Sequence, residues 1–223
     1  MPNPETAARR SPQTSKDVAG RSPGLIGVTG GIACGKSLVM RLLRTHGAVT
    51  FSADEAARAI LTPGGAVLNR IAAAFGPAAM TPDGRLNRAE MGRIVFSDSD
   101  ARERLNALTH PAIRRLLEEQ VASVADDLPG RLIVVEVPLL YEKGLESRYD
   151  QIIVVTASER VQAQRLRRRD GLSDQDIQGR LSAQWPVQDK AARADYVVDN
   201  NDGLEALDAA VSDVWLRLTA GAK

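Results

Sequence analysis

The chain of 223 residues has one cysteine, Cys34, and two histidines. A single cysteine excludes an intramolecular disulfide, and one cysteine with two histidines is too few for a zinc ligand set. No apolar run approaches the ~20 residues that cross a bilayer, and the net charge of +1 gives no general attraction to nucleic acid or to an anionic membrane. These absences favour a globular protein of a reducing, cytoplasmic setting, with neither nucleic acid nor membrane as a partner.

The first 23 residues contain few apolar side chains among Pro, Ser, Thr, Arg and Asp. They lack the apolar stretch of ~7–15 residues that marks a secretory signal. Glu5 and Asp17 also disfavour a transit peptide, which stays the minority interpretation. We therefore predict that residues 1–23 form a disordered extension.

Five short apolar runs have the character of strands, at residues 25–28, 48–51, 132–137, 152–156 and 196–198. Three of them, 25–28, 132–137 and 152–156, are mostly apolar, as in parallel strands buried on both faces. Helical patterns lie between them and after the last one. This alternation predicts an α/β fold with a doubly wound, parallel, five-stranded sheet.

Two segments are longer than a simple strand–helix–strand crossover requires. Residues 52–131 contain several helical patterns separated by turns, and residues 158–193 are charged and helical with a break near Gly171. We expect one domain at 24–220, with its core at 24–54, 131–157 and 194–220. A helical insertion at 55–130 would bind substrate, and residues 158–193 would form a mobile helical lid.

A phosphate-binding loop follows the first predicted strand, in the form Gly30-x-x-x-x-Gly35-Lys36-Ser37. Backbone N–H groups of such a loop surround phosphate oxygens, and the next helix directs its positive end toward them. Lys36 can reach the outer phosphates of a nucleotide, and the Ser37 hydroxyl can bind Mg²⁺. The Gly-Lys-Ser ending argues against a glycine-rich turn of no function.

Ser52 and Glu55 form a capping box, which predicts a helix that begins just after the second strand. Asp54 then lies in the first turn, at the carboxyl end of a strand, where open α/β sheets bind ligands. There an ionised Asp54 can accept a proton from a substrate hydroxyl or hold Mg²⁺ through water. The alternative is that Asp54 only stabilises the helix dipole.

Four arginines, at 165, 167, 168 and 169, lie in the predicted lid. Guanidinium groups complement the negative charge that develops on a phosphoryl group during its transfer. Arg165 and Arg169 share a helix face, whereas Arg167 points elsewhere. For Arg167 and Arg168 we favour the interpretation of a solvated charge.

Four other positions have open interpretations. The His110-Pro111 pair indicates a helix start, with His110 either a capping residue or a ligand contact. His46, before Gly47 at a helix end, is interpreted as structural. Glu136, at the end of the third strand, either approaches Mg²⁺ or closes the strand. Cys34 lies among loop N–H donors that would stabilise its thiolate.

With these features placed, residues 24–218 resemble the dephospho-CoA kinases. The matching segments are LIGVTGGIACGKS (25–37), SADEAAR (52–58), LTHPAIR (108–114), EVPLLYE (136–142), RLRRRDGL (165–172) and RADYVVDN (193–200). The first segment is common to phosphate-loop proteins in general. The PLLYE and ADYVVDN strings, in this order, select the family.

The resemblance implies transfer of the γ-phosphate of ATP, with Mg²⁺, to the ribose 3′-hydroxyl of dephospho-CoA, the last step of coenzyme A synthesis. It implies that Asp54 is the base, that Lys36 stabilises the transferred group and that Arg165 is the lid arginine. The remaining implied contacts are Ala33, Cys34, Gly35, Ser37, Leu38, Arg169 and Asn200 for the nucleotide and Arg58 and His110 for the CoA portion. Asn200 would lie near adenine, and Ser37 would bind the metal. The chain would act as a monomer or a weak homo-oligomer.

Three positions depart from the family pattern. Many members have Gly at the position of Ala33, Thr or Ser at Leu38, and Asp at Ser52. Ala33 would be strained if its φ is positive, Ser37 would be the only loop hydroxyl for Mg²⁺, and Asp54 would act without a second aspartate.

Two other classes were considered. Another small-metabolite kinase with a phosphate loop, of the nucleoside monophosphate or gluconate type, is the main alternative. A GTPase switch is disfavoured because the Asn-Lys-x-Asp guanine motif is absent.

Overall fold

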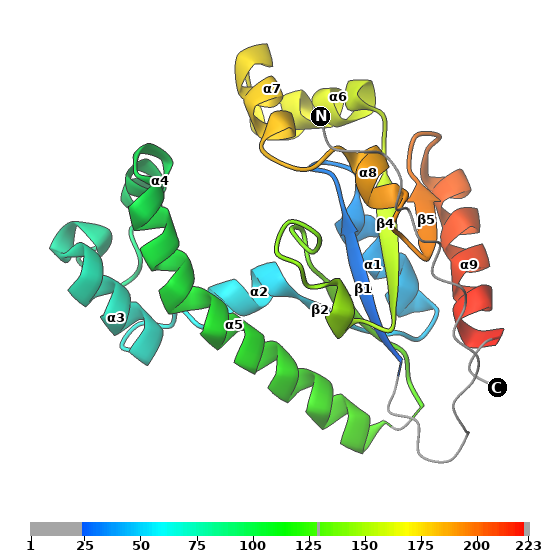
Figure 1. The fold of residues 1–223 in the computed structure, drawn as a ribbon, viewed down its shortest axis with the longest axis horizontal. Coiled ribbons are helices and arrows are strands. Elements are labelled where there is room, and N and C mark those ends of the chain that lie inside the picture. The colour runs from blue at the N-terminus through cyan, green and yellow to red at the C-terminus, as the bar shows by residue number, and fades with distance from the viewer. Residues whose placement is uncertain (1–23, 129, 221–223) are drawn as a thin grey trace, which may run out of the picture.

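The computed structural model describes residues 24–128 and 130–220 (Figure 1). The predicted disordered extension at 1–23 lies outside the described residues. Five strands form one parallel sheet in the order β2-β3-β1-β4-β5. Their bounds are β1 Leu25–Gly30, β2 Val49–Ser52, β3 Ile133–Glu136, β4 Gln151–Thr156 and β5 Tyr196–Asp199. The predicted doubly wound α/β architecture is confirmed, with strand ends shifted by one or two residues.

The central strands are buried on both faces. Consecutive residues of β3 and β4, such as Ile133, Val134 and Ile153, Val154, are fully buried although neighbouring side chains point to opposite faces. Helices therefore cover the sheet. They include α1 (Lys36–Thr45) and α9 (Leu204–Ala220), which pack against each other. The buried side of α9 carries Leu207, Val211, Val214 and Leu218 at helical spacing.

Four α-helices lie between β2 and β3, together with the 3₁₀ turn Pro77–Ala79. They are α2 (Ala53–Ala59), α3 (Ala66–Phe75), α4 (Arg88–Ser97) and α5 (Ser99–Asp127). A second apolar cluster forms among them from Val67, Ile71, Ala79 and Met91. This separate cluster explains how α3 and α4 keep their arrangement away from the sheet (Figure 1).

The helix around His110 differs from the prediction. Pro111 lies inside α5 and does not begin it, and the helix starts at Ser99, where Asp98 Oδ1 accepts from the N–H of Asp100 at 2.8 Å. The Asp98 cap supplies the start signal that was assigned to Pro111. Pro111 lacks a backbone N–H, so α5 loses one helical hydrogen bond there, and the helix nevertheless continues to Asp127.

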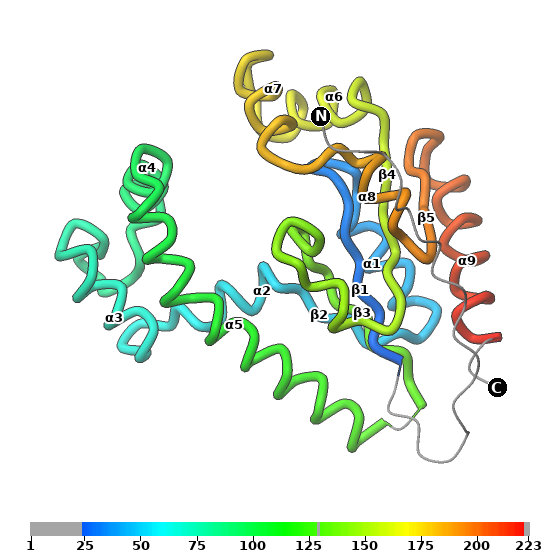
Figure 2. Tube along the Cα trace, viewed as in Figure 1, coloured from blue at the N-terminus to red at the C-terminus, as the bar shows by residue number. Residues whose placement is uncertain are grey.

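Three helices lie between β4 and β5: α6 (Glu159–Asp170), α7 (Asp174–Ser182) and α8 (Val187–Ala191). The predicted break near Gly171 is confirmed, since this residue ends α6 with φ 64°. The third helix, α8, was not predicted, and it packs on β4 and β1. Figure 2 shows α6 and α7 beside the end of the sheet to which β1 and β4 run. Among the described residues, no helix has the length and hydrophobicity to span a membrane.

Candidate active site

The loop after β1 has backbone geometry that a side chain would obstruct. Gly30 and Gly35 have φ of 149° and 94°. A Cβ on Gly30 would lie 2.2 Å from the carbonyl oxygen of Val155. Ala33 also has a positive φ, 57°, so the strain predicted for alanine at this position is present. The turn therefore depends on glycine at both ends of the Gly-x-x-x-x-Gly spacing.

Lys36 begins α1 and its side chain lies along the loop. Its Nζ donates to the carbonyl oxygen of Gly31 at 3.0 Å and to that of Gly30 at 3.4 Å. Burial lowers the pKa of Lys36, while the negative charges of Glu136 and Asp54 act in the opposite direction. An anion in front of the loop would favour the ammonium form further.

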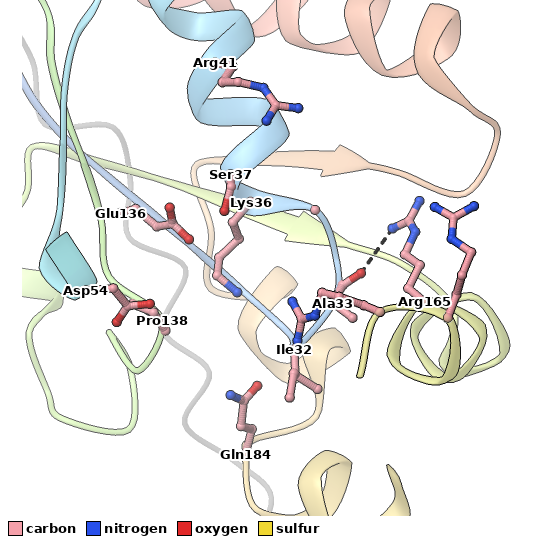
Figure 3. A pocket seen from close by; sticks show the side chains of 13 residues that line it. Ile32, Ala33, Lys36, Ser37, Arg41, Asp54, Glu136, Pro138, Arg165 and Gln184 are labelled. Atoms are coloured by element: carbon pink, nitrogen blue, oxygen red, sulfur yellow. Dashed lines mark hydrogen bonds between the residues drawn. The ribbon is translucent and has the colours of Figure 1, made fainter. Parts of the chain in front are cut away.

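These residues border a cavity of about 600 Å³ (Figure 3). Its walls come from the phosphate loop, α1, α2, the end of β3, α6 and the segment before α8. The lining residues are Ile32, Ala33, Gly35, Lys36, Ser37, Arg41, Asp54, Glu136, Pro138, Arg165, Arg168, Arg169 and Gln184. Five cations and two carboxylates are among them, so the cavity suits a ligand of several negative charges.

Asp54 lies where the capping box places it. Ser52 caps α2, and its Oγ accepts from the N–H of Glu55 at 3.4 Å, which confirms the predicted helix start. Asp54 is then in the first turn, and Figure 3 shows its carboxylate across the cavity from Lys36. A substrate hydroxyl between them would have a proton acceptor on one side and a phosphate site on the other.

Glu136 ends β3, directly opposite Ser52 in the sheet register. Its carboxylate lines the cavity near Ser37 (Figure 3). Burial raises its pKa, and the charges of Asp54 and Glu55 add to that effect, while Lys36 opposes it. Glu136 both closes the strand and lines the cavity, so both interpretations left open for it agree with this position.

The guanidinium of Arg165 ties α6 to the phosphate loop. It donates to the carbonyl oxygens of Ala33 at 3.2 Å, Cys34 at 3.3 Å and Asn200 at 2.9 Å. Asn200 is buried, and its Nδ2 donates to the Cys34 carbonyl at 2.7 Å. Asn200 thus supports the loop from behind, and it is not among the cavity residues.

The prediction from the helix face of α6 is confirmed in part. Arg165 and Arg169 both line the cavity, whereas Arg167 pairs with Asp174 at 2.6 Å outside it. Arg168, interpreted as a solvated charge, is exposed, and it also lines the cavity, because a pocket wall is wider than the single row that i, i+4 spacing defines.

Cys34 does not have the predicted thiolate character. Its side chain is fully buried, and burial raises the pKa of the thiol above its ordinary value of 9.0, outweighing the nearby charge of Lys36. The N–H donors of the loop do not compensate for the loss of water. The earlier interpretation of a stabilised thiolate is wrong.

Three other predicted contacts lie away from the cavity wall. Leu38 packs against the sheet core, and Arg58 and His110 are exposed on α2 and α5, which contact each other. Partial burial and the charge of Lys143 lower the pKa of His110.

His46 caps the end of α1, stacks on Trp215 and contacts Ser212 at 3.2 Å, in agreement with a structural role.

Sequence reasoning missed Arg41 and Gln184. Arg41 lies one helical turn after Ser37, so the i, i+4 spacing within α1 would have predicted that both residues face the same side of the helix. Gln184 reaches the cavity from a segment between two helices, and no local pattern predicts that.

Comparisons with known proteins identify the family of this chain. The dephospho-CoA kinase family model matches residues 24–206. A dephospho-CoA kinase of Syntrophotalea carbinolica is 44% identical over 89% of this chain and 94% of its own length. One of Anaeromyxobacter dehalogenans is 49% identical over 82% and 86%.

Two solved structures have the same fold over most of the chain. A protein of Thermus thermophilus superimposes with a TM-score of 0.77 at 35% identity, over 89% of this chain and 99% of its own. The dephospho-CoA kinase of Campylobacter jejuni gives 0.67 at 27% identity, over 89% and 98%. The chain described here belongs to the dephospho-CoA kinase family.

Proposed function

We propose that this protein transfers the γ-phosphate of ATP to the 3′-hydroxyl of the ribose in dephospho-CoA, giving coenzyme A and ADP. Family membership supports the choice of substrate. The observation that carries the chemistry is the placement of Asp54 and Lys36 on facing walls of one cationic cavity. That arrangement suits attack by an alcohol on a bound triphosphate.

In this proposal the phosphate loop binds the triphosphate through the N–H groups of residues 33–38. Lys36 neutralises charge on the transferred group, and Arg165, Arg168 and Arg169 supply further positive charge from α6. For Arg165 this requires the guanidinium to turn from the loop carbonyls toward phosphate oxygens. Closure of the lid at residues 158–193 would supply that movement and exclude water.

Asp54 acts as the base in the same scheme. Its carboxylate accepts the proton of the 3′-hydroxyl as the oxygen bonds to the γ-phosphorus, and the bond from that phosphorus to the β,γ-bridging oxygen breaks to release ADP. The exposed position of Asp54 at the cavity rim leaves room for an alcohol to approach. The proton then passes to solvent.

The residues at the cavity fit a magnesium ion. No three carboxylate, histidine or cysteine side chains within residues 24–128 and 130–220 form a ready metal cluster. The Ser37 hydroxyl and the Glu136 carboxylate are hard oxygen donors on the same side of the cavity. Mg²⁺ commonly takes one or two protein ligands and completes its shell with water and phosphate oxygens. Bound there, it would offset the charge of the β- and γ-phosphates.

The helical insertion at 55–130 would receive the CoA portion, with contacts from Arg58 on α2 and His110 on α5. Asn200 would act on the nucleotide through the loop that it supports. These roles are consistent with the exposed positions of Arg58 and His110 and with the hydrogen bond from Asn200 to Cys34.

A coupled ADP-release assay tests the proposal. The purified protein is given Mg²⁺ and ATP with dephospho-CoA, AMP, gluconate or shikimate in parallel. We expect ADP release to depend on dephospho-CoA alone. Release driven by AMP or gluconate would instead support the other class of small-metabolite kinase.

A further inference from the structure

Lys190 is the one charged residue among the fully buried residues of the described chain. It lies on the five-residue helix α8, and 0% of its side chain is exposed. Burying an ammonium group is unfavourable unless an opposite charge accompanies it. Burial is the main cause that lowers the pKa of Lys36 in the phosphate loop, and the positive charge of Lys190 lowers that pKa further. Lys190 is therefore close enough to the loop for its charge to act there.

Glu142 provides the opposite charge from a distant part of the sequence. It lies in the loop after β3, and its Oε1 is 2.6 Å from Lys190 Nζ, with 13% of the side chain exposed. At this distance the two groups form an ion pair. Among the described residues, Lys190 Nζ has no hydrogen-bond partner. The other carboxylate oxygen, Oε2, is buried without a hydrogen-bond partner.

Oε1 of Glu142, the oxygen that faces Lys190, also holds the backbone between α7 and α8. It accepts from the N–H of Trp185 at 3.2 Å. The residue just before Trp185 is Gln184, which lines the cavity, and its Oε1 is buried without a hydrogen-bond partner. Figure 3 shows the Gln184 amide directed toward the space near Ile32 and Lys36.

We propose that Glu142 is a positioning residue: its carboxylate, buried with Lys190 as the opposite charge, accepts from the Trp185 N–H and so fixes the segment at 184–185, which keeps the Gln184 amide at the cavity wall and in contact with substrate. The segment that connects α7 of the lid with α8 on the sheet then has a fixed position. Arg193, which lies 5.0 Å over the Trp185 ring, supports the same segment from its exposed side. This inference rests on the phosphoryl transfer proposed above.

Two paired variants separate positioning from stability. In Glu142→Gln/Lys190→Met, both charges are removed but an amide oxygen still accepts from the Trp185 N–H. In Glu142→Leu/Lys190→Met, that acceptor is lost as well. Replacement of a buried ion pair by neutral groups of similar size is often tolerated, so thermal unfolding should verify that both are native at the assay temperature.

Misplacement by a fraction of an ångström slows phosphoryl transfer, and we expect kcat with dephospho-CoA to be about tenfold lower in the Leu variant than in the Gln variant. In a Trp215→Phe background, Trp185 is the only tryptophan, and acrylamide should quench it more strongly in the Leu variant. Equal kcat in the two variants would overturn the proposal, whatever the quenching.

Glu142→Asp is a second test if the Leu variant does not fold. It keeps the negative charge and shortens the reach to Trp185 by one methylene, so kcat should fall while the protein stays folded. An unchanged kcat would contradict the proposal. The quenching measurement needs no turnover. Equal quenching in all variants would therefore refute the role of Glu142 in fixing the segment at 184–185, even if dephospho-CoA proved not to be the substrate.

Discussion

Asn200 occupies the space that a side chain at Gly35 would need. A Cβ on Gly35 would lie 2.1 Å from Asn200 Nδ2, the nitrogen that donates to the Cys34 carbonyl at 2.7 Å. Gly35 also has φ of 94°, so the backbone and the neighbouring side chain both require glycine. Support for the phosphate loop therefore comes from the residue that follows β5, 165 positions further along the chain.

Gly35→Ala should abolish measurable ATP binding in a calorimetric titration. The clash with Asn200 and the left-handed strain together cost about 2–4 kcal/mol, which is roughly 30- to 1000-fold in affinity if it falls on the loop. Gly64→Ala is the matched control. Its φ is 75°, but a Cβ there would meet nothing within 4 Å, so ATP binding should be retained. Unchanged ATP binding in Gly35→Ala would contradict this role of Asn200.

Asp54→Asn should lose most phosphoryl transfer while keeping ATP binding. The amide keeps the shape but cannot accept the proton, and a general base contributes roughly 10²–10⁴-fold in rate. Steady-state kcat with dephospho-CoA is the measurement. Glu55→Gln changes the next carboxylate in the same helical turn, which does not line the cavity, and should leave kcat nearly unchanged. Near wild-type turnover in Asp54→Asn would mean that Asp54 is not the base.

Arg165→Ala should lower kcat much more than Arg167→Ala. Arg165 lies at the cavity and donates to two carbonyl oxygens of the loop and to that of Asn200, whereas Arg167 makes an exposed ion pair with Asp174. Exposed pairs contribute little to stability, so Arg167→Ala should also leave the unfolding temperature close to wild type. Equal losses of kcat would contradict the assignment of helix α6 faces.

Cys34 should react slowly with iodoacetamide in the folded protein. Burial raises the pKa of its thiol, so the thiolate is scarce at neutral pH, and the reaction should accelerate as the pH rises above 9.0. Because the pKa of Cys34 is higher in the folded than in the unfolded protein, its contribution to the free energy of unfolding is fully present below pH 9.0 and decreases above it. Mass spectrometry of timed samples measures the rate, with the denatured protein as reference. Reaction at neutral pH as fast as in denaturant would contradict the buried environment.

The sequence was sufficient for the sheet and for the centre of the site. Uninterrupted apolar runs predicted the buried parallel strands, and the motif from Gly30 to Ser37 predicted the phosphate loop, because both signals are local. The capping box at Ser52 and Glu55 placed Asp54 correctly for the same reason. Each of these features depends on residues within a few positions of one another.

The features that were missed depend on residues far apart in the sequence. The contact of Glu142 with Trp185 spans 43 positions, and that of Asn200 with Cys34 spans 166. The pKa of Cys34 was misjudged because its burial comes from the packing of the loop on the sheet, which the motif does not show. The helix start predicted at Pro111 was wrong because the Asp98 cap begins α5 twelve residues earlier, at Ser99.

Transfer of the γ-phosphate from ATP labelled at that position, followed by identification of the labelled product, tests the central claim most directly. With dephospho-CoA and Mg²⁺, we predict that the label appears as a 3′-phosphomonoester on the ribose, in an amount equal to the ADP formed. Label found only as inorganic phosphate, or on AMP or gluconate in place of dephospho-CoA, would contradict the account.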